Sequence, residues 1–280
     1  MKKTLLALLL ACSMPAAAAG PSADLRLYAL DCGRLAFEDL GQFSDTFEYD
    51  GHSRTMQASC FLIRHPRGVL LWDAGLGDRL AAMRDGRRAR ILGSDVTMTV
   101  PVTLASQLAS IGLDFDGVDY FAFSHGHADH LGNAPALTRA TWIVNRAELD
   151  WLRRTPAPER THPALSEGAL RVGTVTIERD HDVFGDGSVR ILSAPGHTPG
   201  HQVLLVRLPH SGPVLLSGDL YHTRDNRAER RMPVFNVDRA DTLASIDRIE
   251  RIVARLGARV LIQHSREDFQ TLPALPGYLD

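Results

Sequence analysis

Lysine is almost missing from this chain of 280 residues: Lys2 and Lys3 are the only two, and every other strongly basic residue is arginine. A protein that has lost its first nineteen residues therefore has no lysine at all. This absence excludes a Schiff-base lysine and a phosphate-binding P-loop lysine from its chemistry. Loss of the two lysines also lowers the formal charge from −2 to −4, which argues against partners such as nucleic acid or anionic lipid.

Cysteine and long apolar runs are also scarce. No stretch approaches the ~20 apolar residues that a membrane-spanning helix needs. Of the three cysteines, Cys32 and Cys60 lie in strand-like runs. The sequence leaves open whether these two form a disulfide or stay buried as free thiols, and neither has the surroundings of a catalytic thiolate.

Residues 1–19 have the parts of a secretory signal: a basic start, a short apolar run and three alanines before Gly20. We therefore expect a signal peptide over residues 1–19, a single domain over residues 20–280 and a periplasmic or secreted protein. The alternative is a lipoprotein anchored through Cys12, which ends a lipobox-like Leu-Leu-Ala-Cys run.

Short apolar runs bounded by Gly, Pro and Asp predict β-strands along the whole chain. They lie at 25–30, 60–63, 69–72, 118–123, 141–144, 189–192, 202–206, 213–216 and 259–262. Apolar residues at helical spacing appear at 102–111 and at 239–256. The second helix has Asp238 as its expected N-cap and Gly257 as its stop. This order predicts a layered α/β sandwich.

Three imidazoles and a carboxylate fall within six residues, directly after the predicted strand at 118–123. They are His125, His127, Asp129 and His130. Packing does not call for such a cluster, because each buried polar group without a partner costs ~1–3 kcal/mol. Histidine is the commonest protein ligand of zinc, and Asp completes such sites. The cluster therefore predicts a metal site.

Three more candidate ligands each follow a predicted strand. They are His197, Asp219 and His264. The full set of five histidines and two aspartates is large enough for two metal ions that share one carboxylate. Structural zinc sites are closed sets of four ligands, typically rich in Cys, so this set indicates catalysis.

These segments resemble the metallo-β-lactamase superfamily. The resemblance rests on the H-x-H-x-D-H run, the G-H-T-P-G-H segment at 196–201, the S-G-D segment at 217–219 and the late histidine. Asp73 also matches the early aspartate of the family. The resemblance covers the chain from about Leu25 onward, and it implies a four-layer αβ/βα sandwich with a dinuclear zinc site.

The resemblance also implies an assignment of the metal ligands. His125, His127 and His197 would hold one zinc ion, Asp129, His130 and His264 the other, and Asp219 would bridge the two. The sequence does not fix which metal is bound in the cell.

Within the superfamily, several activities fit poorly. Asp219 stands where β-lactamases carry Cys or Ser, and only sixteen residues follow His264, too few for the helical region of glyoxalase II. What remains is similar to the N-acyl homoserine lactonases. We therefore expect N-acyl homoserine lactones as substrates, with other lactones, aryl esters or organophosphate triesters as alternatives. A homodimer is compatible with the sequence.

Lactonases of this kind often carry a Tyr three residues after the bridging Asp, where it assists at the substrate carbonyl. That position is His222 here, with Tyr221 beside it. We expect His222 to assist, with Tyr221 as the alternate, because adjacent strand residues point in opposite directions. A metal-bridging hydroxide would attack the lactone carbonyl, and Asp129 would carry the proton to the leaving oxygen.

Three further features concern the surroundings of the site. His201 is expected either to orient a ligand or to lie on the surface. Phe43, Phe47 and Met56 are candidates for an apolar groove that takes an acyl chain. The arginine-rich stretch 79–90 is expected to be a solvated loop or helix face, with the mouth of the site as the alternative.

Overall fold

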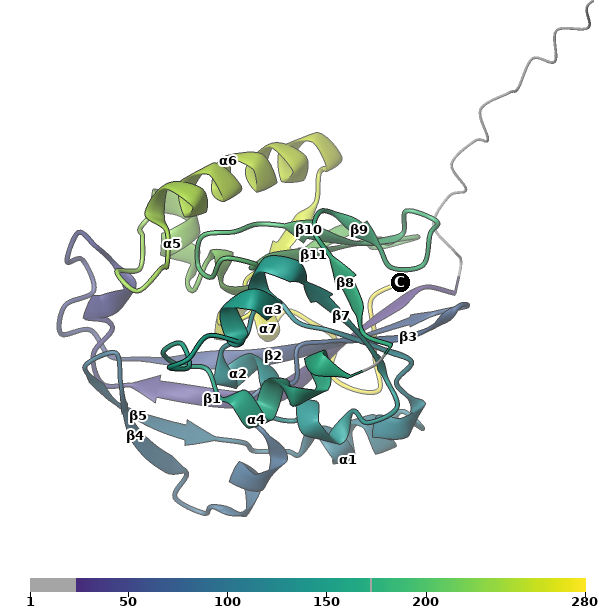
Figure 1. Cartoon of the computed structure of the whole chain (residues 1–280), viewed down its shortest axis with the longest axis horizontal. Helices are drawn as coiled ribbons and strands as arrows, with labels where there is room; N and C mark the ends of the chain where they lie inside the picture. Colours follow the sequence, from purple (N-terminus) through teal and green to yellow (C-terminus); the bar gives the residue numbers. More distant parts are fainter. Residues whose placement is uncertain (1–23, 172) are drawn as a thin grey trace, which may run out of the picture.

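The computed structural model describes residues 24–171 and 173–280. The predicted signal peptide, with Cys12, lies outside the described residues. Two β-sheets pack face to face, and helices cover the outer side of each sheet (Figure 1). This arrangement is the four-layer αβ/βα sandwich that the sequence predicted.

The first sheet has eight strands in the order β4-β5-β1-β2-β3-β6-β7-β8. The first five strands in this order pair antiparallel with one another. From β3 onward, through β6, β7 and β8, neighbouring strands are parallel. The strands are β1 (Arg26–Phe37), β2 (Arg54–His65), β3 (Gly68–Trp72), β4 (Arg87–Ile91), β5 (Ser94–Thr99), β6 (Tyr120–Ala122), β7 (Thr141–Asn145) and β8 (Val175–Ile177).

The second sheet has five strands in the order β13-β12-β11-β10-β9. They are β9 (His181–Asp182), β10 (Val189–Ser193), β11 (Gln202–Leu208), β12 (Gly212–Leu216) and β13 (Arg259–Leu261). Only the β12–β13 pair is parallel, as its connection through a long helix requires.

That long helix is α6 (Arg239–Leu256), which lies over the second sheet (Figure 1). Both predicted ends are confirmed: the Asp238 side chain accepts a hydrogen bond from the Asp241 amide, and Gly257 ends the helix at φ 62°. The other helices are α1 (Leu104–Ser110), α2 (Ala128–Leu131), α3 (Arg146–Leu152), α4 (Pro163–Ser166), α5 (Arg224–Glu229) and α7 (Arg266–Phe269). No helix within 24–171 and 173–280 combines the length and the apolar character needed to cross a membrane.

Alternating side chains of the central strands enter different core layers. On β2, Cys60 and Leu62 point toward the helical side, while Phe61 and Ile63 point between the sheets. Both faces are buried because each sheet has a helical layer on one side and the other sheet on its opposite side. This is why the strands read as continuous apolar runs rather than as polar–apolar alternation.

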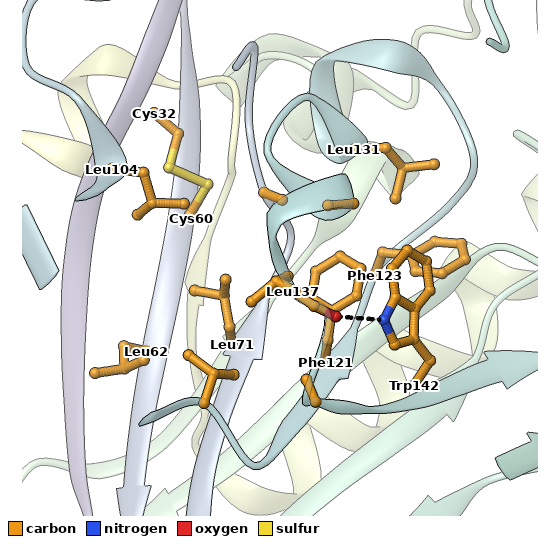
Figure 2. Close-up of a cluster of buried hydrophobic side chains, with 14 of the residues drawn as sticks. Cys32, Cys60, Leu62, Leu71, Leu104, Phe121, Phe123, Leu131, Leu137 and Trp142 are labelled. Atoms are coloured by element: carbon orange, nitrogen blue, oxygen red, sulfur yellow. Dashed lines mark hydrogen bonds between the residues drawn. A yellow bond between two sulfur atoms is a disulfide. The ribbon is translucent and has the colours of Figure 1, made fainter. Parts of the chain in front are cut away.

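Cys32 and Cys60 form a disulfide between the neighbouring strands β1 and β2 (Figure 2). The structure thus decides between the two states that the sequence left open. The disulfide lies in the same buried cluster as Phe121 and Trp142. The Trp142 indole donates to the Leu137 carbonyl at 3.2 Å, so this large side chain is buried without an unpaired N–H (Figure 2).

The β4–β5 hairpin was not predicted. Residues 87–90 form part of a strand, so the expectation of a loop or helix face is wrong there. Arg87, Arg88 and Arg90 are exposed. Charged side chains on this edge strand hide the apolar alternation from which a strand is predicted, and they also discourage edge-to-edge pairing with other chains. The start of the stretch, residues 79–82, belongs to the 3₁₀ helix η2 (Asp78–Ala82).

Candidate metal centre

The seven predicted ligands meet at one end of the sandwich. His125 follows β6, His197 follows β10, Asp219 follows β12 and His264 follows β13. The turn at Asp219 depends on Gly218, which has a φ of 50° and lies against His201: a Cβ there would be 2.7 Å from the imidazole Nε2. Close packing of strand ends therefore brings together residues that are far apart in sequence.

Three imidazole nitrogens converge on one point. His125 Nε2 lies 2.7 Å from His127 Nδ1, and His197 Nε2 lies 3.2 and 3.1 Å from these two atoms. The other nitrogen of His197, Nδ1, is 2.9 Å from Asn236 Oδ1. Burial lowers the pKa of all three histidines well below the usual value, so they are neutral, the form that binds metal.

Asp129, His130 and His264 form a second group beside the first. His130 Nδ1 is 2.9 Å from Asp73 Oδ2, and His264 Nδ1 donates to the Gln57 carbonyl at 2.7 Å. These outer contacts fix each ring so that Nε2 faces the group, the arrangement by which metal-binding histidines are usually oriented.

Asp219 lies between the two groups and contacts both. Its Oδ1 is 3.2 Å from His130 Nε2 and 3.0 Å from His264 Nε2, while its Oδ2 is 3.3 Å from His197 Nε2. Burial alone raises the pKa of this carboxyl, but the surrounding histidines lower it well below the usual value. The Asp219 amide donates to His201 Nε2 at 2.9 Å. His201 is therefore a buried residue that holds the Asp219 turn, rather than a surface residue.

The donor chemistry fits two divalent ions. His130 Nε2 and Asp219 Oδ1 are buried and lie 3.2 Å apart, but neither makes a hydrogen bond of good geometry within the described part of the chain. Buried polar atoms left in this state cost free energy unless a cation binds them. Imidazole and carboxylate ligands suit zinc, but the same set also accepts other first-row metals.

Glu148 is a buried carboxyl that no sequence motif singles out. It accepts hydrogen bonds from the Gly126 and Gly200 amides and from the Thr198 hydroxyl. Burial raises its pKa to about 7. Glu148 thereby connects the loop that carries His125 and His127 to the loop that carries His197.

His222 and Tyr221 point in opposite directions. His222 Nε2 is 3.0 Å from Asp219 Oδ2, and its ring packs edge-on against Phe43. Tyr221 instead donates its hydroxyl to Glu250 at 2.7 Å, in the core beneath α6. The structure does not bring Tyr221 to the site, so Tyr221 is wrong as the alternate, because its hydroxyl is already bonded elsewhere.

A cavity of about 1140 Å³ opens onto the two ligand groups. Its apolar lining comes from β1, β2, β4, β5, η2 and α4 and from the loops between elements. Phe43 and Met56 belong to this wall as expected, whereas Phe47 is 75% exposed. The wall also includes Arg79, Arg87, Arg90 and Arg160. The stretch 79–90 therefore contributes to the site as well as to the surface.

A sandwich of two sheets with two His/Asp groups at the strand ends is the architecture of metal-dependent hydrolases of the metallo-β-lactamase fold. The model of the metallo-beta-lactamase superfamily matches residues 54–264, and the chain belongs to that superfamily. This confirms the family that the sequence motifs indicated.

The chain is similar over nearly its full length to N-acyl homoserine lactonases. It is 31% identical over 268 residues to N-acyl homoserine lactonase AttM of Azorhizobium caulinodans, covering 92% of this chain and 99% of the relative. It is 27% identical over 257 residues to an N-acyl homoserine lactonase of Bacillus cereus, covering 91% and 98%. It is thus a metal-dependent hydrolase related to these lactonases.

A solved structure gives the same relationship in three dimensions. It is an N-acyl homoserine lactone hydrolase with the product N-hexanoyl-L-homoserine bound at its catalytic metal centre. Its TM-score to this chain is 0.78 at 26% sequence identity, over 91% of this chain and 98% of that one.

Proposed function

We propose that this protein opens the lactone ring of N-acyl homoserine lactones with the help of two zinc ions. The observation that carries the proposal is the position of Asp219, whose two oxygens face two separate ligand groups at one side of a largely apolar cavity. The similarity to lactonases over the whole fold supports the choice of substrate.

The residues would divide between the metals as the two groups divide in space. His125, His127 and His197 would hold one ion, Asp129, His130 and His264 the other, and Asp219 would contact both. When bound, two such ions make a water molecule nucleophilic near neutral pH and polarise the carbonyl oxygen of an ester.

The chain's own groups supply the remaining steps. Asp129 faces the cavity, with its side chain 23% exposed, so its carboxylate can pass a proton to the ring oxygen as that oxygen leaves. Burial lowers the pKa of His222, which keeps its imidazole neutral with a single N–H. If that proton is on Nε2, which faces Asp219 Oδ2 at 3.0 Å, it can donate to the substrate carbonyl when the carboxylate binds a metal ion instead. The apolar part of the cavity wall would contact the acyl chain.

Zinc-loaded protein (residues 20–280) incubated with N-hexanoyl and N-decanoyl homoserine lactone tests the proposal, with acid release as the measure of ring opening. Asp219→Ala is expected to abolish opening and to reduce the zinc content, while Tyr221→Phe, changed outside the site, should leave both intact. If the zinc-loaded protein hydrolyses an aryl ester or a phosphotriester but opens neither lactone, the proposed lactone substrate is overturned. The assignment to the metal-dependent hydrolases would then still hold.

We also propose that residues 1–19 are removed on export to the periplasm or medium. The Cys32–Cys60 disulfide supports this, because disulfides persist mainly in oxidising compartments. Mass spectrometry of the protein from fractionated cells tests it. A mature N-terminus at Gly20 is expected, whereas a lipid-modified N-terminus at Cys12 would support the lipoprotein alternative, and a cytoplasmic full-length chain would contradict both.

A further inference from the structure

Arg160 is fixed to the ligand loop through its backbone. It lies between α3 and α4, and its carbonyl accepts the Ala128 amide at 3.0 Å, next to a bridge between His127 and Thr161. Its φ of 62° is in the left-handed region, which is unfavourable for a residue with a side chain. This backbone conformation is therefore maintained by its surroundings, and it places the side chain in the cavity wall.

The side chain is fixed as well. Its guanidinium carbon lies 4.3 Å from the centre of the Phe235 ring, and Nη2 donates to the Phe235 carbonyl at 3.3 Å. The same ring also packs edge-on against His222 and His197, with centroids 5.4 and 5.9 Å away. Phe235 thus contacts both the guanidinium and two histidines of the site, and Arg160 lines the same cavity without being a candidate ligand.

The guanidinium is incompletely satisfied. Its Nε is buried without a hydrogen-bond partner, and no carboxylate lies within ion-pair distance of Arg160 in the described ranges. Burial lowers the pKa of Arg160, and Asp129, Asp219 and Glu159 oppose this only at longer range. The two aspartates are assigned here to divalent ions, which would offset their negative charge. A half-buried cation with so little compensation is costly unless a bound molecule supplies an oxygen acceptor.

We propose that Arg160 binds the amide carbonyl oxygen of the substrate's acyl group and makes the site prefer lactones with an acylamino substituent over lactones with a plain alkyl chain. This inference rests on the proposed lactonase function and deepens it. The lactone carbonyl reacts at the ligand groups, and Arg160 lines the same cavity without being a candidate ligand, so its guanidinium can meet the substituent on the adjacent ring carbon. The acyl chain beyond the amide then meets the apolar wall.

The experiment compares two substrates in Arg160→Met, which keeps a long apolar side chain and removes every donor. One is N-hexanoyl homoserine lactone, and the other is a γ-lactone with an alkyl chain of equal length and no amide. We expect kcat/KM to fall about 10- to 100-fold for the first and less than about threefold for the second, as for loss of one charge-assisted hydrogen bond. Arg160→Lys should recover part of the loss.

Arg64→Met is the matched control. Arg64 also stacks on an aromatic ring, 5.7 Å from the centre of Tyr28, and donates to a backbone carbonyl, but outside this cavity. The Arg64→Met variant should leave the ratio of the kcat/KM values for the two lactones unchanged. A second readout is the Kd of the ring-opened product N-hexanoyl-L-homoserine by calorimetry, which should rise about 10- to 100-fold in Arg160→Met with zinc content unchanged.

Equal losses on both substrates together with an unchanged product Kd would overturn the role of Arg160. If Arg160→Met does not fold, Arg160→Gln, which keeps a neutral donor, is tested in the same way. If the wild-type protein opens neither lactone, the proposed function is contradicted. The role of Arg160 is then tested by the product Kd alone: a rise in Arg160→Met supports the role, and an unchanged Kd overturns it.

Discussion

His130 directs Nδ1 to Asp73 Oδ2 at 2.9 Å, and this contact turns its Nε2 toward Asp219. The Asp73 carboxylate also accepts hydrogen bonds from the Ser124 amide and hydroxyl and from the Gln263 side chain. Asp73 therefore connects the ends of β3, β6 and β13. The sequence identifies His130 as a ligand, but its orientation is set by residues that follow three different strands.

Asp73→Asn tests this connection. Asn tolerates the φ of 60° at this position, but its amide replaces one oxygen acceptor with a donor. We expect the affinity of the His130 group for zinc to fall about 10- to 100-fold with the fold retained. Competition with a chelator measures this affinity. Unchanged affinity at both sites would show that Asp73 does not orient His130.

His222→Phe and Tyr221→Phe are expected to have opposite effects. In His222→Phe the new phenyl ring would preserve packing against Phe43 and Phe235 but would donate nothing, so kcat should fall about 100- to 1,000-fold. Tyr221→Phe removes only the bond to Glu250, so kcat should stay constant while the free energy of unfolding falls by about 1 kcal/mol. Steady-state kinetics and urea unfolding separate the two effects. A drop in kcat for Tyr221→Phe would contradict its placement in the core.

The disulfide is expected to stabilise the fold by restricting the unfolded chain. Cys32 and Cys60 are 28 residues apart, and the chain-entropy model for a loop of that length gives about 3–4 kcal/mol. Replacing both with Ala should lower the free energy of unfolding by this order. Urea unfolding with and without reductant measures it, and reductant should have no effect on the double variant. Equal stability of all samples would exclude a contribution from the disulfide.

Glu148 predicts a pH dependence of stability. Its folded pKa of about 7 is above the usual 4.5, so the folded protein binds more protons than the unfolded chain between these values. The contribution of Glu148 is therefore complete below about pH 4.5 and is lost as the pH rises through about 7. Glu148→Gln cannot titrate, so the stability of the wild type relative to this variant should fall from pH 5 to pH 8. Urea unfolding at a series of pH values measures it, and parallel profiles would contradict the prediction.

The ligand set was predictable because its signals are local. His125, His127, Asp129 and His130 lie within six residues, and His197, Asp219 and His264 each directly follow an apolar run. A strand, a turn and a polar side chain can be read from neighbouring residues. The superfamily, the layered fold and the ends of α6 followed from the same kind of information.

Other features depend on contacts between distant segments, and no local pattern encodes them. Packing of the sheets decides that Cys32 and Cys60 form a disulfide. It also decides that His222, rather than Tyr221, faces Asp219. Glu148 and Arg160 look like ordinary charged residues in the sequence. Their partners are Gly126, Thr198, Gly200 and Phe235, which only the folded chain brings within reach. The sequence by itself determined which residues can bind metal and which family they belong to. The tertiary structure decided how they are oriented and what surrounds them, because orientation and burial are properties of packed strands rather than of any one segment.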